Sequence, residues 1–279
     1  TADIIARVRA QIPGRLVAVF SESNIGGAGG FERGLRTAVE MFDPDWMVVM
    51  DDDARPAPGA LAAFHDGDHR GWDAVAAAVY FPGGEICEMN RPSRNPFWSF
   101  GGTLRLLRHV LAGRGRDGFH IARAAYEGRE KLPIDATSFV GLFLSRGAIE
   151  RAGYPDPRLF IYGDDVLYTL DWREKGGSIA FDPRIEFEHD FSTIRPEEKR
   201  FDPLWKSYYH HRNLLIVYRR SAGIFFWPSL LVVLPKWLLK VRYHRGERRP
   251  YLRLLAYAVR DGLTIRLGAT LEEIRKLST

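Results

Sequence analysis

The sequence predicts an α/β protein in which a mostly parallel, Rossmann-like sheet is flanked by helices and followed by a basic helical extension at the C-terminus. Three observations lead to this prediction. Short apolar runs alternate with helical patterns over the first 80 residues, as in chains whose strands are joined by crossover helices. Three consecutive aspartates follow one such run, at the position where α/β sheets bind ligands. From residue 203 onward the pattern is helical and basic.

The composition fits one large globular domain with an appendage. Of the 279 residues, 46% are hydrophobic and 27% are charged, which excludes wholesale disorder and a polytopic membrane protein. The single cysteine, Cys87, excludes an internal disulfide framework and a zinc site built from several thiolates, and it favours a reducing compartment. Residues 1–10 predict an amphipathic helix instead of a signal peptide.

The charge is divided unevenly along the chain. Residues 195–279 contain 18 Lys and Arg against 7 Asp and Glu, a net charge of +11, whereas residues 1–194 contain 22 against 28, a net charge of −6. We therefore expect a sheet domain over residues 1–202 and a basic helical region over residues 203–279. A basic region of this kind can meet nucleic acid, phospholipid or another anionic polymer.

The expected elements follow from the spacing of apolar residues. Apolar β-type runs predict strands at residues 16–20 and 46–50, and between them a glycine-rich turn at 24–30 leads into a helix at 31–41. The acidic residues at positions 164 and 165 suit the positive N-terminal end of a helix. The remaining expected elements are a short helix ending at residue 63, a strand at 75–80, loops over 81–135 with one helix near 104–111, a strand at 139–144, helices at 146–152 and 164–175, and short strands at 179–181 and 185–187.

The acidic triplet Asp51, Asp52 and Asp53 is the first candidate for chemistry. Adjacent like charges resist ionisation unless something positive lies among them. A divalent cation such as Mg²⁺ or Mn²⁺ satisfies alternate carboxylates and also prefers phosphate oxygens. The alternative is a solvated acidic turn, but the place directly after the apolar strand 46–50 favours the metal.

The glycine-rich run at residues 24–30 is a second candidate. Backbone N–H groups without bulky side chains can approach an anion closely, and Arg33 follows where it can reach a phosphate. The run lacks the Gly-Lys-Ser/Thr of a P-loop. An ordinary strand-to-helix turn explains it equally well.

Asp164, Asp165 and His189 complete the candidate residues. A carboxylate at a helix start is often a cap, but beside a metal site one of this pair could accept a proton from an attacking hydroxyl. His189 ends an apolar run and could be a third metal ligand, although a lone histidine there is more often structural.

The order of these motifs resembles family 2 glycosyltransferases of the GT-A fold. The motifs are NIGGAGGF at 24–31, DW at 45–46 before the acidic triplet, DPRLFIYGDD at 156–165, and His189. The similarity is greatest to bacterial galactofuranosyl- and rhamnosyltransferases that build cell-surface glycans, and it covers about residues 15–220, including YYHHRN at 208–213. Such relatives usually begin with a further strand and helix, which we expect to be missing here, and Gly163 stands where many have Trp or Glu.

The resemblance implies a role for each candidate. Asp51, Asp53 and His189 would hold Mn²⁺ or Mg²⁺, Asp165 would be the catalytic base, and Asp164 would bind the acceptor. The donor would be lined by Asn24, Gly26, Gly27, Gly29, Gly30, Arg33 and Asp52. The implied reaction is inverting transfer from a nucleoside-diphosphate sugar, UDP-galactofuranose above all, to a lipid-linked or polysaccharide glycan. The alternatives are a rhamnosyltransferase using dTDP-rhamnose, a non-catalytic membrane-associated scaffold and a metal-dependent phosphohydrolase.

The C-terminal region carries a strongly apolar stretch at residues 223–240, interrupted by Pro228, Pro235 and Lys236. It is shorter than a confident transmembrane helix, but its aromatic and basic residues suit the membrane interface. We expect peripheral contact through residues 221–260 at the cytoplasmic face of a bacterial membrane, where anionic lipid attracts cations. Helices packed on the sheet domain or on a second subunit are the alternative. Nucleic acid fits poorly, because the cations alternate with large aliphatic residues.

Overall fold

The computed structural model describes residues 2–190 and 200–279. Its strands form one mixed sheet in the order β1-β5-β3-β6-β2, and β4 also pairs with β6. The strands are β1 (Trp46–Val49), β2 (Ala54–Pro56), β3 (Ala74–Tyr80), β4 (Leu132–Ile134), β5 (Leu142–Ser145) and β6 (Ile179–His189).

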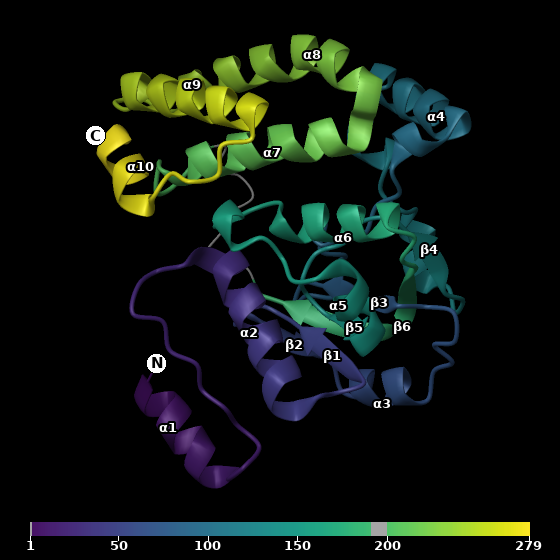
Figure 1. The fold of residues 1–279 in the computed structure, drawn as a ribbon. Coiled ribbons are helices and arrows are strands. Elements are labelled where there is room, and N and C mark those ends of the chain that lie inside the picture. Colours follow the sequence, from purple (N-terminus) through teal and green to yellow (C-terminus); the bar gives the residue numbers. More distant parts are fainter. Residues whose placement is uncertain (1, 191–199) are drawn as a thin grey trace.

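Helices cover both faces of the sheet, and a helical layer lies at one end of it (Figure 1). The α-helices are α1 (Ala2–Gln11), α2 (Gly26–Phe42), α3 (Ala60–His65), α4 (Phe100–Leu111), α5 (Arg146–Ala152), α6 (Asp164–Glu174), α7 (Lys206–Ala222), α8 (Phe226–Leu239), α9 (Arg248–Thr264) and α10 (Leu271–Leu277). The short 3₁₀ helices are η1 (Pro96–Trp98), η2 (Gly115–Gly118), η3 (Arg123–Glu127), η4 (Pro157–Leu159), η5 (Gly223–Phe225) and η6 (Lys240–Tyr243).

Strand β3 shows why the sheet has two covered faces. Its sequence AVAAAVY alternates sides and is buried almost throughout. Ala74, Ala76 and Ala78 belong to the core shared with α2, α5 and α6, whereas Val75 and Val79 belong to the core shared with α3. Small alanines on one side allow the helices to pack closely against the strand.

The predicted α/β class with helices flanking a sheet is confirmed, but the sheet is mixed instead of mostly parallel. Among the pairings of the described strands, β3 with β6 is parallel, and β1 with β5, β5 with β3, β2 with β6 and β4 with β6 are antiparallel. The physical reason is that β2, β4 and β5 enter the sheet from turns and loops, without the crossover helix that parallel neighbours require.

Two predicted boundaries are wrong near the N-terminus. Residues 16–20 form no strand, because no described strand pairs with their backbone, and Phe20 is 66% exposed. The glycine run predicted as a turn lies inside α2, which begins at Gly26. Later in the chain, the two strands predicted at 179–181 and 185–187 are one strand, β6, whose register against β3 shifts at Ala77/Ala78.

Helices α7 to α10 form a separate core against the end of the sheet domain. Within the described ranges, one helical stretch, Lys206–Tyr243, is long and apolar enough to cross a membrane by length and composition alone. The stretch is not straight: α7 ends at Ala222, and α8 runs back beside it (Figure 1). The 14 residues of α8 rise about 21 Å, which is less than the hydrocarbon thickness of a bilayer.

Candidate active site

The turn from β1 to β2 brings the acidic triplet against the end of β6. The turn is closed by the N–H of Ala54, which donates to the carbonyl oxygen of Asp51 at 3.2 Å. Strand β2 then pairs antiparallel with β6, with Ala54 opposite His189. Because Asp53 precedes Ala54, this register sets its side chain beside His189, and Nε2 of His189 lies 2.8 Å from Oδ1 of Asp53.

Asp51, Asp53 and His189 form a cluster suited to a divalent cation. One ligand atom from each residue lies within 4.8 Å of the other two. Burial raises the pKa of the Asp51 carboxyl, and although His189 opposes this shift, the carboxylates of Asp53 and Asp52 add to it. Two neighbouring carboxylates repel unless a positive charge lies between them, and two carboxylates with an imidazole nitrogen are a donor set that fits Mn²⁺ or Mg²⁺.

Asn90 orients the histidine of this cluster. The His189 imidazole is 3% exposed, and its Nδ1 lies 2.9 Å from Oδ1 of Asn90. The Asn90 amide is itself held, since its Nδ2 donates to Ser138 Oγ at 2.8 Å and its Oδ1 accepts from Cys87 Sγ at 2.9 Å. An amide oxygen only accepts, so Nδ1 of His189 donates to Asn90, and this hydrogen bond directs Nε2 toward Asp53. The sequence did not predict this role of Asn90, and no local pattern marks it.

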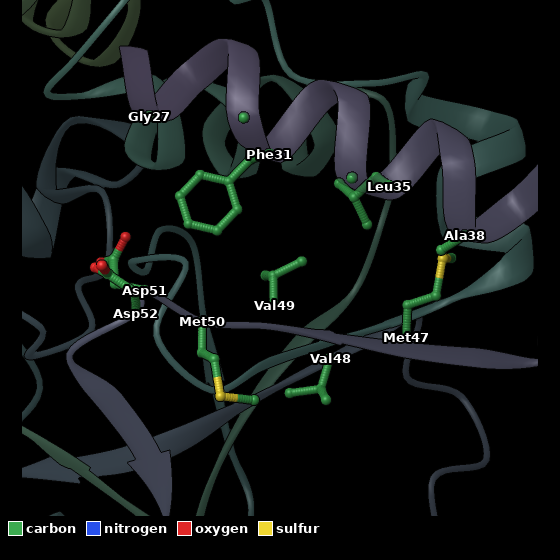
Figure 2. Close-up of a pocket in the computed structure, with 12 residues that line it drawn as sticks. Gly27, Phe31, Leu35, Ala38, Met47, Val48, Val49, Met50, Asp51 and Asp52 are labelled. Carbon is green, nitrogen blue, oxygen red and sulfur yellow. The ribbon is translucent and has the colours of Figure 1, made fainter. Parts of the chain in front are cut away.

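A cleft of about 490 Å³ begins at the acidic turn and runs between α2 and β1. Figure 2 shows the carboxylates of Asp51 and Asp52 at one end of it, with Phe31 of α2 across from Val49 of β1. Gly27 and Gly30 line the same cleft, and a Cβ on either would meet nothing within 4 Å. The structure therefore brings three of the predicted donor residues, Gly27, Gly30 and Asp52, to one cleft.

Asn24 and Gly26 have a different position. The Asn24 Oδ1 accepts from the N–H of Gly26 at 2.9 Å and so begins α2. Gly26 has φ +71°, and a Cβ there would lie 2.0 Å from the carbonyl oxygen of Phe160. The same carbonyl accepts from the N–H of Ala28 at 3.1 Å. These glycine-run groups therefore hold the loop before Asp164, instead of presenting free N–H groups to an anion.

Gly29 and Arg33 also lie outside this cleft. Gly29 is buried, and a Cβ on it would lie 2.9 Å from the Ile25 Cβ. The Arg33 guanidinium is turned toward the N-terminal segment, where it donates to Ser21 Oγ at 2.8 Å. It lines a second cavity beside residues 15–21. The structure does not bring Arg33 to the acidic turn.

Asp164 and Asp165 begin α6. Burial raises the pKa of both carboxyls, and the negative charge of Asp51 raises each further. The charge of Asp164 also raises the pKa of Asp165. A raised pKa suits a group that must accept a proton near neutral pH. The shared influence of Asp51 means that the second acidic cluster lies within electrostatic reach of the first.

Two buried residues of α7, Arg212 and Asn213, hold the loop that leads to this acidic pair. The Asn213 Nδ2 lies 2.8 to 3.0 Å from the carbonyl oxygens of Leu159, Ile161 and Tyr162. The Arg212 guanidinium donates to the Leu159 carbonyl at 2.9 Å and to Asn213 Oδ1 at 2.8 Å.

This support lets the loop keep an unfavourable backbone. Phe160 and Tyr162 have φ values of 68° and 69°, in a region that residues other than glycine rarely adopt. The predicted division at residues 202 and 203 therefore separates α7 from a loop that it holds in place. The division itself stays a prediction.

Asp165 lines a cavity of about 480 Å³ between α6, α7 and the segment after α4. The walls include Tyr162, Tyr218 and Phe119, together with the polar side chains of His120 and Arg116. Aromatic faces with a few polar groups are typical of sugar-sized ligand sites. Asp164 instead lines a neighbouring cavity on the other side of α6, beside Asp156 and Arg158.

Most of the chain matches a known protein family. Residues 1–206 match the model of a family described as glycosyltransferase like family 2. The chain is 29% identical over 246 residues to galactofuranosyltransferase GlfT1 of Mycolicibacterium smegmatis, covering 82% of this chain and 72% of that protein. It is 30% identical over 166 residues to GlfT1 of Mycobacterium tuberculosis, covering 57% of this chain and 48% of that protein.

A second kind of relative is longer. The chain is 25% identical over 232 residues to galactofuranosyltransferase GlfT2 of Mycolicibacterium smegmatis, covering 77% of this chain and 32% of that protein. Among solved structures, a crystal structure of GalNAc-T7 with UDP, GalNAc and Mn²⁺ matches 99% of this chain and 45% of that chain, with a TM-score of 0.48 and 13% sequence identity.

Proposed function

The chain belongs to glycosyltransferase-like family 2 and is a glycosyltransferase that uses a nucleotide-sugar donor and a glycan acceptor; from this premise we propose that it transfers galactofuranose from UDP-galactofuranose, with inversion, in a metal-dependent reaction. The observation that carries the proposal is the convergence of Asp51, Asp53 and His189 within 4.8 Å at the end of the α2–β1 cleft. The choice of sugar is supported by relatives named galactofuranosyltransferases.

The roles of the side chains follow from their positions. A divalent cation held by Asp51, Asp53 and His189 would neutralise the diphosphate leaving group. Asp52, Gly27 and Gly30, along the cleft, would contact the donor. Of the remaining donor residues taken from the resemblance, Asn24 and Gly26 would act by positioning the loop before Asp164.

Asp165 would accept the proton of the acceptor hydroxyl. The hydroxyl oxygen forms a bond to the anomeric carbon while the bond from that carbon to the diphosphate oxygen breaks, so the configuration inverts. One protein base is enough for this step. The cavity lined by Asp165, Tyr162 and Tyr218 would bind the acceptor glycan. Asp164 lines the cavity on the other side of α6, so in place of the predicted acceptor contact it would act by raising the pKa of Asp165.

We also propose that the protein acts at the cytoplasmic face of a bacterial membrane, through residues 221–260. Support comes from the outer side of α8, where Trp227 is 62% and Leu231 is 80% exposed. An acceptor carried on a lipid would be reached there.

The test is transfer with Mn²⁺ or Mg²⁺ and a panel of nucleotide sugars that includes UDP-galactofuranose and dTDP-rhamnose. Asp165→Asn should lower transfer by several orders of magnitude without loss of fold. Asp171→Asn, on the same helix but bonded to Arg220, is the matched control and should keep most of the activity. Transfer from dTDP-rhamnose and not from UDP-galactofuranose would refute the proposed donor. Undiminished turnover by Asp165→Asn would refute Asp165 as the catalytic base. A scaffold would transfer nothing, and a phosphohydrolase would release phosphate from simple esters without an acceptor.

A further inference from the structure

Helix α4 exposes an apolar stripe that nothing in the reaction explains. Phe100, Leu104, Leu107 and Leu111 are spaced four, three and four residues apart, so they share one side of the helix. Their exposed fractions range from 38% for Leu104 to 85% for Phe100, and α4 has no fully buried residue. A helix packed on a soluble protein usually turns this side inward.

Helix α8 and the preceding η5 expose a second stripe. Ile224, Trp227, Leu231 and Leu238 follow helical spacing and are between 51% and 84% exposed. The opposite side of α8, with Phe226 and Trp237, is buried in the core of the helical layer.

The two stripes lie at the same end of the molecule. In Figure 1, α4 lies beside the turn between α7 and α8. Two contacts fix this arrangement: the rings of Phe97 and Phe225 stack at 5.6 Å, and the Asn95 Nδ2 donates to the Ser221 carbonyl at 3.0 Å. Helix α4 and the start of α8, which are more than 100 residues apart in the chain, are therefore held at the same end of the molecule.

The two segments that carry the stripes are rich in cations. The sequence has no Asp or Glu at residues 89–116 or at residues 203–246. The exposed cations in these two segments include Arg105, Arg108, Arg114, Lys236, Arg242 and Arg245. Apolar side chains set among cations suit a surface whose headgroups are anionic and whose interior is apolar. A second copy of the chain suits it less, because a symmetric contact would set this face against itself and bring like charges together.

We propose that α4 and α8 form one membrane-docking face, with α4 as a second anchor that inserts its leucine stripe into a leaflet containing anionic lipid. The inference rests on the proposed function and deepens it, because α4 also carries a wall of the Asp165 cavity. Helix η2 packs on the inner side of α4, where a Cβ on Gly118 would lie 2.9 Å from the Leu106 Cα. Arg116 and Phe119, in and just after η2, line the cavity. Docking through α4 therefore holds the cavity lined by Asp165 close to an acceptor carried on a lipid.

The experiment measures sedimentation of the whole chain with phosphatidylcholine vesicles, with and without phosphatidylglycerol. Wild type should bind the vesicles that contain phosphatidylglycerol, and high salt should weaken binding. Leu107→Glu/Leu111→Glu should lower the affinity for these vesicles by at least about tenfold. The substitution removes two leucines that would insert into the leaflet and adds two negative charges that the anionic lipid repels. Met41→Glu/Leu61→Glu makes the same changes at exposed sites on α2 and α3 and should bind as wild type does. Circular dichroism and Tm check that each variant is folded.

Three results would overturn the proposal. The first is a Leu107→Glu/Leu111→Glu protein that binds as the control does while Leu231→Glu does not, which would leave contact through α8 alone. The second is absence of vesicle binding by wild type. The third is a wild-type dimer that the α4 substitutions dissociate, which would make the face a protein interface. Sugar transfer to a short soluble acceptor distinguishes failure of the docking proposal from failure of the proposed function. The α4 substitutions should not lower this transfer. If wild type binds vesicles but transfers no sugar, the proposed function is refuted and the docking proposal is not.

Discussion

Nε2 of His189 lies 2.8 Å from Oδ1 of Asp53, although the two residues are 136 positions apart in the chain. The short antiparallel pairing of β2 with β6 produces this contact, because Ala54 lies opposite His189. Asp51 lies beside this pair, and one ligand atom from each of the three residues lies within 4.8 Å of the other two. A divalent cation among them would offset the repulsion between the two carboxylates.

The first prediction concerns metal binding. Mn²⁺ should raise the Tm of wild type, because a ligand that binds only the folded chain stabilises it by mass action, by about 2.7 kcal/mol at a hundredfold excess over Kd. Asp53→Asn should remove most of this rise, since a neutral amide is a poor ligand for the ion. Without metal, Asp53→Asn should melt at or above the wild-type temperature, because one of the clustered negative charges is gone.

The matched control for this measurement is Asp66→Asn, an acidic residue at the end of α3. It should leave the Mn²⁺ response unchanged. An equal Mn²⁺ response in Asp53→Asn and wild type would show that the ion binds elsewhere.

The second prediction concerns Asn90. Asn90→Leu removes the acceptor that holds the His189 hydrogen on Nδ1, so the apparent affinity for Mn²⁺ should fall by about 10- to 100-fold. Asn90→Asp keeps an acceptor oxygen and should recover most of the loss. Calorimetric Mn²⁺ titration of the three proteins provides the comparison. Equal weakening in both variants would mean that packing, and not the hydrogen bond to His189, is responsible.

The third prediction concerns the support that α7 gives to the loop before Asp164. Asn213→Ala should lower the free energy of unfolding by about 1–3 kcal/mol, because buried carbonyl oxygens lose their donor. It should also lower kcat more than it weakens Mn²⁺ binding, since the loop leads to Asp165 and not to Asp53. Transfer kinetics and Mn²⁺ titration, both well below the Tm, measure the two effects.

Asn95→Ala is the control for Asn213→Ala. Like Asn213, Asn95 is buried and its side chain donates to a backbone carbonyl. Its acceptor is Ser221 in α7 and not a residue of the loop before Asp164. It should destabilise the protein with little change in kcat. A similar fall in kcat for both variants would assign the effect to general stability.

Local patterns predict the elements whose cause is local. Strand β1 has a short apolar run, α5 is predicted at its observed bounds, and α6 begins at the predicted acidic residue. Residues 16–20 have the same apolar signal as β1, but a strand also needs a neighbour, and no local pattern reports whether one is available. The start of α2 at Gly26 depends on the Phe160 carbonyl, which lies 134 positions away in the chain, and glycine disfavours helix in isolation.

The candidate site shows the same division. Residue type marks the acidic triplet and the Asp164–Asp165 pair, and Asp51 influences both carboxyls of that pair. The structure directs Arg33 to Ser21, away from the acidic turn. Asn90 acts only through distant partners. Arg212 and Asn213 had one signal, because they belong to the stretch YYHHRN at 208–213 that carries part of the family resemblance. Buried polar side chains need hydrogen-bond partners, and these two bond to the loop before Asp164.

The last prediction concerns Asp165 and pH. Its pKa is raised in the folded chain, first by burial and then by Asp164, so the folded state holds this proton to a higher pH than the unfolded state does. Stability from this group is therefore greatest at low pH and falls as pH rises from the ordinary carboxyl range toward the raised value. Asp165→Asn keeps the shape but cannot ionise, so its Tm, measured calorimetrically in a metal chelator, should exceed that of wild type by a margin that grows with pH.

Each of the two carboxylates makes ionisation of the other less favourable. The rise in Tm of the double substitution Asp164→Asn/Asp165→Asn should therefore be smaller than the sum of the rises of the two single substitutions. In the wild-type enzyme, the same raised pKa should place the acidic limb of the pH dependence of transfer above about 4. A Tm difference between Asp165→Asn and wild type that does not change with pH would mean that Asp165 ionises as an ordinary carboxyl, and the argument for it as a base tuned by burial would fail.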